Sequence, residues 1–236
     1  MVSAGTFAEM LRALQSYEEL RKIQRYFKSD AGEYGEGDVF IGVKMGSIFA
    51  LAKEFIHMAP DEIEVLLESP IHELRVGACS IMAKQFGYEN TSETRREELF
   101  NLYVRRHDRI NNWDLVDLAA REVVGRWLMA RPRDLLYELT RSANMWKRRT
   151  AMLATMQFLR VNQHDDAYAI AQILQTDSQD LIHKVVGGVL RFAGDKDQPR
   201  LLAYLEQSAK SMPRTMLRYA IEHLNKPQKS SLSARN

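Results

Sequence analysis

The segment MWKRRTAMLATMQFLR, residues 145–160, decides the fold class of this chain. Its apolar side chains recur at spacings of three and four residues, which is the period of a helix with one or more buried faces. The same spacing recurs along the whole chain, and strand-like alternation is almost absent. The pattern predicts an all-α protein of short, closely connected helices. Most prolines lie at or near the expected helix starts, where proline costs little: Pro60, Pro70, Pro132, Pro199 and Pro213.

Four of these segments resemble copies of one unit. The segments HELRVGACSIMA, MWKRRTAMLATM, DLIHKVVGGVLR and MPRTMLRYAIE each carry an early basic residue followed by small and apolar residues. These basic residues are Arg75, Arg149, Lys184 and Arg214, and the last three are separated by 35 and 30 residues. Helical-hairpin repeats have periods of roughly 30 to 47 residues. We therefore expect an α-solenoid of antiparallel helix pairs, with these cations making a positive groove on its concave face.

Composition sets the wider limits. With 236 residues, of which 45% are hydrophobic, the chain is long enough to bury a substantial core. The single cysteine, Cys79, excludes a disulfide framework and fits a reducing compartment. No apolar run approaches membrane-spanning length, and the N-terminus lacks a signal-peptide pattern, so we expect a cytoplasmic protein with no membrane partner. A formal net charge of +2 neither requires nor excludes a polyanionic partner.

Two segments depart from the helical rhythm. Residues 26–46 contain several glycines but no GK[ST] ending and no preceding strand, which favours a long surface loop over a loop that cradles phosphates. Residues 226–236, KPQKSSLSARN, are polar and basic without an apolar period, so we expect a disordered tail. The remaining residues, 1–225, are predicted to form a single repeat domain.

The available chemistry is narrow. The histidines are dispersed without an HExxH pair, and no GxSxG elbow occurs, so we expect neither a metal nor a cofactor. Carboxylates, arginines and aromatic residues remain. In INNWDLVDLAA, residues 110–120, a cap residue and Asp114 suit a helix start, and Asp117 follows Trp113 by one turn on the same face. Asp117 could instead form an ordinary surface pair with Arg121.

Several motifs together resemble the AlkD-type DNA alkylation-repair glycosylases. They are NNWDLVD at 111–117, SANMWKRRTAM at 142–152, DLIHKVVGGVLR at 180–191, MPRTMLRYAIE at 212–222 and the loop GEGDVFIGVK at 35–44. The resemblance implies a solenoid of HEAT-like repeats that wraps duplex DNA and excises cationic alkylated purines such as 3-methyladenine and 7-methylguanine. It also implies a monomer of the bacterial cytoplasm or nucleoid.

The resemblance also assigns roles to single residues. The family's catalytic aspartate falls on Asp117, its lesion-side tryptophan on Trp113 and its active-site arginine on Arg149. The alternatives are that the tryptophans fill gaps between repeats and that the arginines are solvated surface charges. The side chains that we expect to contact DNA are Lys44, Arg75, Trp146, Arg148, Lys184, Arg214 and Arg218.

One position departs from the family pattern. Where the family often has a second lesion-side tryptophan, this chain has Gly188, in the run GGVLRF. Half of the aromatic grip on the lesion is therefore missing, and Phe192 lies one turn further on. Besides a glycosylase, this departure leaves two alternatives: a catalytically weak or inactive DNA-binding repeat protein, and a protein-binding helical scaffold.

Overall fold

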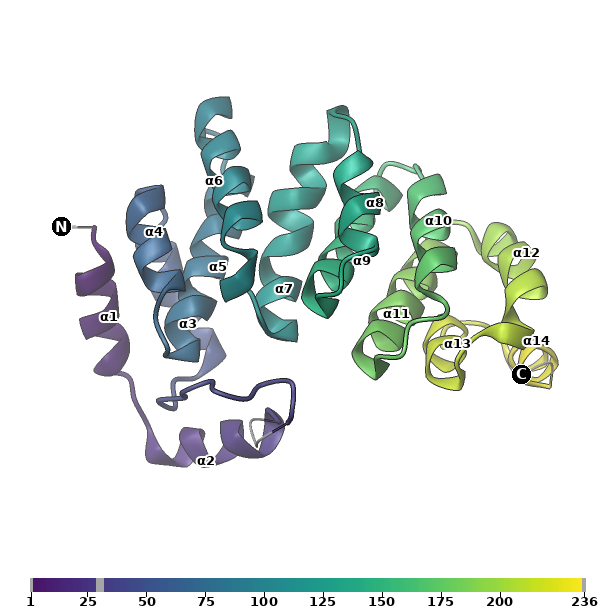
Figure 1. Ribbon diagram of the computed structural model, residues 1–236, viewed down its shortest axis with the longest axis horizontal. Coiled ribbons are helices and arrows are strands. Elements are labelled where there is room, and N and C mark those ends of the chain that lie inside the picture. The colour runs from purple at the N-terminus through teal and green to yellow at the C-terminus, as the bar shows by residue number, and fades with distance from the viewer. Residues whose placement is uncertain (1, 29–31, 235–236) are drawn as a thin grey trace. The chain divides into compact units, whose positions relative to one another are not determined.

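The computed structural model describes residues 2–28 and 32–234 and is all-helical over them (Figure 1). Helix makes up 72% of the chain, and the described residues contain no strand, only an isolated bridge between Val39 and Ile71. The predicted α-solenoid of helical repeats is confirmed. No helix in this described part has both the length and the apolar character needed to span a membrane.

The helices alternate with short connections, and many begin at a side-chain cap or at a proline, as the sequence predicts. The α-helices are α1 (Ala4–Arg12), α2 (Tyr17–Tyr26), α3 (Met45–Glu54), α4 (Pro60–Leu67), α5 (His72–Gly87), α6 (Glu93–Arg105), α7 (Trp113–Ala119), α8 (Asp134–Thr140), α9 (Met145–Leu159), α10 (Asp165–Leu174), α11 (Asp180–Lys196), α12 (Gln198–Ser208), α13 (Arg214–Ala220) and α14 (Lys226–Ser233). Short 3-10 turns are η1 (His107–Arg109), η3 (Leu128–Ala130) and η4 (Ala209–Ser211), and η2 (Ala120–Gly125) is a π-helix.

The chain divides into two compact units, Met1–Trp127 and Leu128–Asn236. In a solenoid each repeat contacts only its neighbours, so an array separates readily into units of this kind. The single repeat domain expected over residues 1–225 therefore stays a prediction.

Helix α5 is the centre of the first unit. It packs against α3, α4, α6 and α7, and it is buried on all sides for most of its length. Among its buried side chains are three polar ones at its start, His72, Glu73 and Arg75. Because a buried charge is tolerated only when it is paired or hydrogen-bonded, the start of α5 requires polar partners from neighbouring segments.

The glycine-containing segment before α3 supplies some of those partners. It is a loop, as predicted, and it is tied to α5, since the backbone N–H groups of Ile41 and Gly42 donate to Oε1 of Glu73 at 3.0 and 2.8 Å. Gly42 has a φ of 82°, and a Cβ at this position would lie 2.3 Å from the carbonyl oxygen of Ser16. Only glycine fits this close backbone approach without strain.

In the second unit, α9, α11 and α13 are neighbours, and α8, α10 and α12 pack against them. Helix α11 approaches α13 closely at Gly187, where an added Cβ would lie 2.4 Å from the carbonyl oxygen of Met216. The C-terminal segment differs from the prediction of a disordered tail. Residues 226–233 form α14, whose start has a capping box between Asn225 and Gln228 and whose Leu232 is buried. One apolar anchor and a reciprocal cap order this polar segment.

Candidate active site

An aromatic cleft lies in the first unit, between α2, the loop before α3 and the start of α7. Its volume is about 350 Å³. The indole of Trp113 stacks on Phe27, with ring centroids 5.5 Å apart and an interplanar angle of 16°, and Phe27 in turn stacks on Phe40 at 5.2 Å. Tyr26 meets Trp113 edge-on at 5.7 Å. The indole of Trp113 therefore packs against neighbouring aromatic rings and also lines the accessible cleft.

Charged side chains also line this cleft. Lys44, one of the predicted DNA contacts, is exposed, and its Nζ lies 3.9 Å from a carboxylate oxygen of Glu19. Lys22 is held more closely, at 2.7 Å from Glu18 and 2.8 Å from Glu19. Hydrogen bonds and charge from Lys22 lower the pKa of Glu18. Of the two lysines that line this cleft, Lys44 is thus the one whose ammonium group lies further from its carboxylate partner.

Asp117 is exposed on α7, one turn beyond Trp113. Helix α7 continues directly into the π-helix η2, and π-turns of this kind occur frequently at functional sites. The alternative partner considered for Asp117, Arg121, donates from Nε to Glu122 at 2.8 Å. The predicted pair of a carboxylate and an indole therefore lies on one helix, with the carboxylate exposed to solvent.

Beneath the cleft lies a buried charge network, which we define as Asp38, His72, Arg75, Asn112 and Asp114. The imidazole of His72 bridges two carboxylates, with Nδ1 at 3.1 Å from Asp38 and Nε2 at 2.8 Å from Asp114. The guanidinium of Arg75 donates to the second oxygen of Asp38, and the amide of Asn112 donates to Asp38 at 2.9 Å. His72, Arg75, Asn112 and Asp114 are all buried.

This network shifts two pKa values. Burial disfavours the ionised form of Asp38, but hydrogen bonding from His72 and the charge of Arg75 outweigh it and lower the pKa of Asp38 to about 2. Burial likewise disfavours the imidazolium of His72, while hydrogen bonds to Asp114 and Asp38 raise its pKa to about 9. At neutral pH, His72 and Arg75 are therefore cations that neutralise two carboxylates.

The predicted DNA contact of Arg75 is wrong. Arg75 is only 3% exposed and is paired with Asp38 inside the first unit. The early basic position that suggested a groove residue instead supplies a buried counter-ion, because α5 is enclosed by its neighbours.

The start of α9 in the second unit corrects one further assignment, that of Trp146, and shows the partners of Arg148. Trp146 is 7% exposed and belongs to the core, so its predicted contact with DNA is wrong. Arg148 is bound to Asp177, with Nε 2.6 Å from the carboxylate, and its Nη1 donates to the backbone carbonyls of Ser142 and Ala143. These protein acceptors hold Arg148 in place, and its role as a DNA contact stays a prediction.

Arg149 is placed differently from its neighbour. It is 7% exposed, and its Nη1 donates to the carbonyl oxygen of Leu181 at 2.9 Å. This bond fixes one arm of the guanidinium against the start of α11. The role of Arg149 at the active site stays a prediction.

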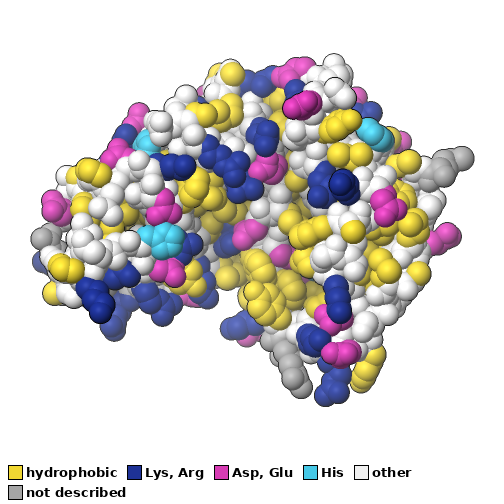
Figure 2. Space-filling view, turned by 180° about the vertical axis from the view of Figure 1, so that it is seen from behind, with side chains coloured by type: hydrophobic (Ala, Val, Ile, Leu, Met, Phe, Trp, Pro, Cys, Tyr) yellow, Lys and Arg dark blue, Asp and Glu magenta, His cyan; other side chains and the backbone are white. Residues whose placement is uncertain are grey.

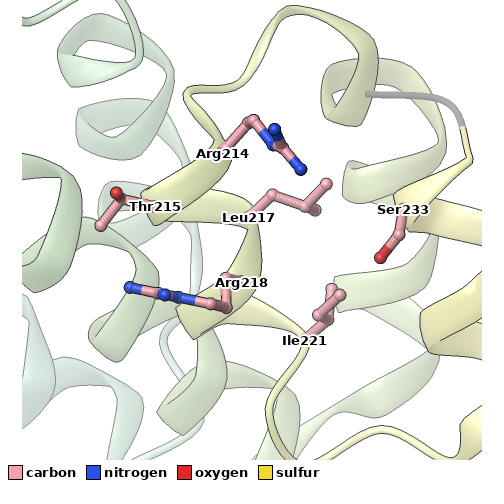
Figure 3. Close-up of a pocket in the computed structure, with 6 residues that line it drawn as sticks. All are labelled: Arg214, Thr215, Leu217, Arg218, Ile221 and Ser233. Carbon is pink, nitrogen blue, oxygen red and sulfur yellow. The ribbon is translucent and has the colours of Figure 1, made fainter.

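Other predicted cations of the second unit are more accessible. Lys184 is partly exposed and pairs with Asp180 at 2.7 Å. Arg214 and Arg218, one turn apart on α13, are exposed, and neither forms an ion pair within the described part of the chain. They line a cleft of about 620 Å³ together with Thr215 and Ser233 (Figure 3). On the face shown in Figure 2, Lys and Arg side chains are interspersed with Asp and Glu, as the near-neutral net charge implies.

Gly188 leaves open space. An added Cβ there would meet no atom within 4 Å, in contrast to the crowded position of Gly187. Close helix packing therefore does not explain the glycine at this position, where the family resemblance implies a tryptophan. Across the described residues, no group of three or more His, Cys, Asp or Glu side chains is placed to hold a metal ion.

With this geometry established, comparisons identify the family. The chain matches the family of DNA alkylation repair enzymes over residues 7–224. The chain belongs to this family. The resemblance seen in the sequence is thereby confirmed, and membership implies DNA as the substrate.

A structural comparison agrees on the fold. A predicted DNA alkylation repair enzyme from Enterococcus faecalis matches with a TM-score of 0.70 and 17% sequence identity, covering 90% of this chain and 97% of that one. At this identity, the likeness concerns the fold alone. No curated protein matches the chain in sequence.

Sequence reasoning missed the buried charge network. Asp114 was explained by the helix dipole alone, and Asp38 and His72 were not assigned to any site. A usable signal was present, since His72 and Arg75 lie one turn apart on a helix that is otherwise mostly apolar. Buried charges at that spacing require partners, and the nearby loop and helix cap contain suitable ones.

Proposed function

We propose that this repair enzyme is a DNA glycosylase that hydrolyses the N-glycosidic bond of cationic alkylated purines, such as 3-methyladenine and 7-methylguanine, in duplex DNA. The observation that carries the proposal is the exposed side chain of Asp117, which lies one turn beyond Trp113, a residue that lines the aromatic cleft. Helix α7 thus presents the negative charge of Asp117 and the accessible π face of Trp113 together.

The chemistry needs little more than this pair. Alkylation makes the purine cationic and weakens its bond to C1′ of the sugar. When that bond breaks, its electron pair stays with the base, which leaves neutral, and positive charge develops on the sugar. The carboxylate of Asp117 stabilises that charge and orients the water that adds to C1′, whose proton passes to solvent. The indole of Trp113 attracts the cationic nucleotide through its π face.

Binding to the duplex would rest on exposed cations, and four of those expected from the sequence are exposed or partly exposed: Lys44, Lys184, Arg214 and Arg218. The family resemblance also implies that Arg149 donates to a phosphate, in addition to the bond from its Nη1 to Leu181. Because phosphate contacts release counter-ions, affinity for undamaged duplex DNA should fall steeply with salt, and Arg218→Ala should reduce that slope by about one unit. An affinity independent of salt would favour the protein-binding scaffold.

The decisive experiment is single-turnover release of 7-methylguanine by the native chain and by Asp117→Asn. The substitution keeps the shape and removes the charge, so excision should fall by roughly 10² or more while DNA binding persists. Asp108→Asn makes the same change at an exposed aspartate of the same unit and should excise normally. Excision that survives unchanged in Asp117→Asn would refute the role of this carboxylate.

The open space at Gly188 favours a second candidate, a DNA-binding protein with weak or no catalysis. Gly188→Trp restores the side chain expected at this position. A gain in excision would show that the missing indole limits the site. If both the native chain and a folded Gly188→Trp variant release no base while binding DNA, the non-catalytic function is the correct one.

A further inference from the structure

The buried charge network holds the backbone on both sides of Trp113. The residue before it, Asn112, donates to Asp38 at 2.9 Å, and the residue after it, Asp114, accepts from Nε2 of His72 at 2.8 Å. Asn112 also caps α7, since its side-chain oxygen accepts from the N–H of Trp113 at 2.8 Å. The first turn of α7 is therefore joined to the loop before α3 and to α5.

The same network contacts the aromatic rings of the cleft. The imidazole of His72 packs against Phe27 and Phe40, with ring centroids 5.1 and 4.8 Å apart. Phe27 also stacks on the indole of Trp113, with the two rings nearly parallel. The position of the indole thus depends on His72 along two routes, through the backbone of α7 and through the stacked rings.

Burying charged groups in a core costs desolvation free energy that their mutual attraction only partly offsets. An apolar replacement of similar volume is often at least as stable, so a network of this kind is explained better by the geometry that it specifies. It has three segments to align: the loop carries Asp38, α5 carries His72 and Arg75, and α7 carries Asn112 and Asp114.

We infer that the buried charge network is a positioning device, which fixes the first turn of α7 so that Trp113 and Asp117 meet the substrate in one defined orientation. Asp38, His72 and Asn112 are positioning residues that do not touch the substrate. The catalytic part of this inference rests on the proposed glycosylase function, whereas the placement of Trp113 does not.

The test uses Trp113 as its own reporter. The substitutions Trp127→Phe and Trp146→Phe leave it as the only tryptophan of the chain. In this background, Asn112→Ser keeps an effective N-cap but removes the amide that donates to Asp38. The matched control is Asn144→Ser, because Asn144 caps α9 by accepting from the N–H of Trp146 and belongs to the second unit, whereas the network belongs to the first. Asp38→Asn is a second variant, which removes the negative charge of Asp38 and keeps the shape of its side chain.

Four measurements are compared: helix content, acrylamide quenching of Trp113, binding of undamaged duplex and single-turnover release of 7-methylguanine. We expect Asn112→Ser to keep its helix content and its DNA affinity within about twofold, to raise quenching, and to slow excision by about 10-fold or more, because small displacements of reacting groups cost large rate factors. Asn144→Ser should leave quenching and excision unchanged.

The outcomes separate the two proposals. If the native background releases no base, the glycosylase function fails, and quenching alone decides whether the network places Trp113. If Asn112→Ser is folded and its quenching equals that of the control, the positioning role is refuted. Raised quenching with full excision refutes the catalytic half of the inference. If Asp38→Asn does not fold, Asn112→Ser, which keeps the cap, decides.

Discussion

Helices α7 and α9 begin alike in sequence and differently in structure. Each starts at a capping asparagine and carries a tryptophan in its first turn, Trp113 and Trp146. Trp113 follows its cap directly, whereas Trp146 comes one residue later, and one residue turns a helix by about 100°. Trp113 lines the cleft of its unit, and Trp146 lies in the core. The offset of a tryptophan from its cap therefore separates an accessible indole from a packing one.

The charges at the two starts differ in the same way. At α7 the polar partners are buried and include two carboxylates that share one imidazole. At α9 the partly exposed Arg148 is held by Asp177 and by backbone carbonyls. The first arrangement depends on buried charges that neutralise one another, and in the second a single arginine is bound by the residues of a loop. Substitutions should expose this difference.

The largest effect is expected for Arg75→Met. Removing the guanidinium leaves Asp38 buried with one counter-ion fewer, and breaking a buried pair costs about 3 to 5 kcal/mol. Chemical unfolding followed by circular dichroism measures the loss in the free energy of unfolding. If Arg75→Met lowers the free energy of unfolding by less than the equivalent change at α9, the pairing of Arg75 with Asp38 contributes less to stability than the buried network requires.

That equivalent change is Arg148→Met. Its partners, Asp177 and the carbonyl oxygen of Ser142, lie nearer to solvent and can recruit water, so we expect a loss of about 1 to 3 kcal/mol in the same measurement. Lys184→Met is the control for an exposed pair and should cost about 1 kcal/mol or less. An Arg148→Met loss equal to that of Lys184→Met would show that the bonds of Arg148 contribute little.

These two helix starts also show what the sequence could and could not predict. Helical spacing, caps and prolines depend on neighbours in the chain, and they predicted the all-α solenoid correctly. The motif around Trp113 and Asp117 likewise predicted an indole and an exposed carboxylate on one helix. Burial depends on which helices enclose a segment, so Arg75 and Trp146 were assigned to a surface that they do not reach. The tail was mispredicted because a single anchor, Leu232, orders an otherwise polar helix.

The pH dependence of stability should distinguish the network from the α9 start. The pKa of His72 is raised to about 9, so its contribution is complete below the unfolded value of about 6.5 and is lost as pH rises through 9, by up to about 1.4 kcal/mol per pH unit. The pKa of Asp38 is lowered to about 2, so its contribution is present above about 3.9 and is lost as pH falls through 2. Asp38, Asp114 and Arg75 are the charged groups facing the imidazole.

The measurement is the free energy of unfolding from pH 6 to 10 for the native chain and for His72→Gln. The glutamine cannot titrate, so the alkaline loss should disappear in this variant. An equal alkaline loss in both proteins would assign the effect to other groups and refute the raised pKa of His72.

The smallest effect concerns α11 of the second unit, where Gly188 stands at the position for which the family resemblance implies a second lesion-side tryptophan. Glycine within a helix costs about 0.5 to 1 kcal/mol relative to alanine, and a Cβ at Gly188 meets no atom within 4 Å. Gly188→Ala should therefore raise the free energy of unfolding by about that amount.

The control is its neighbour, because a Cβ at Gly187 would lie 2.4 Å from the carbonyl oxygen of Met216, and Gly187→Ala should destabilise the protein. Opposite signs at these adjacent positions would establish that Gly188 faces unfilled space, the condition under which Gly188→Trp can add an aromatic wall. A destabilising Gly188→Ala would mean that the space is already filled, and the comparison with Trp113 would then fail on steric grounds.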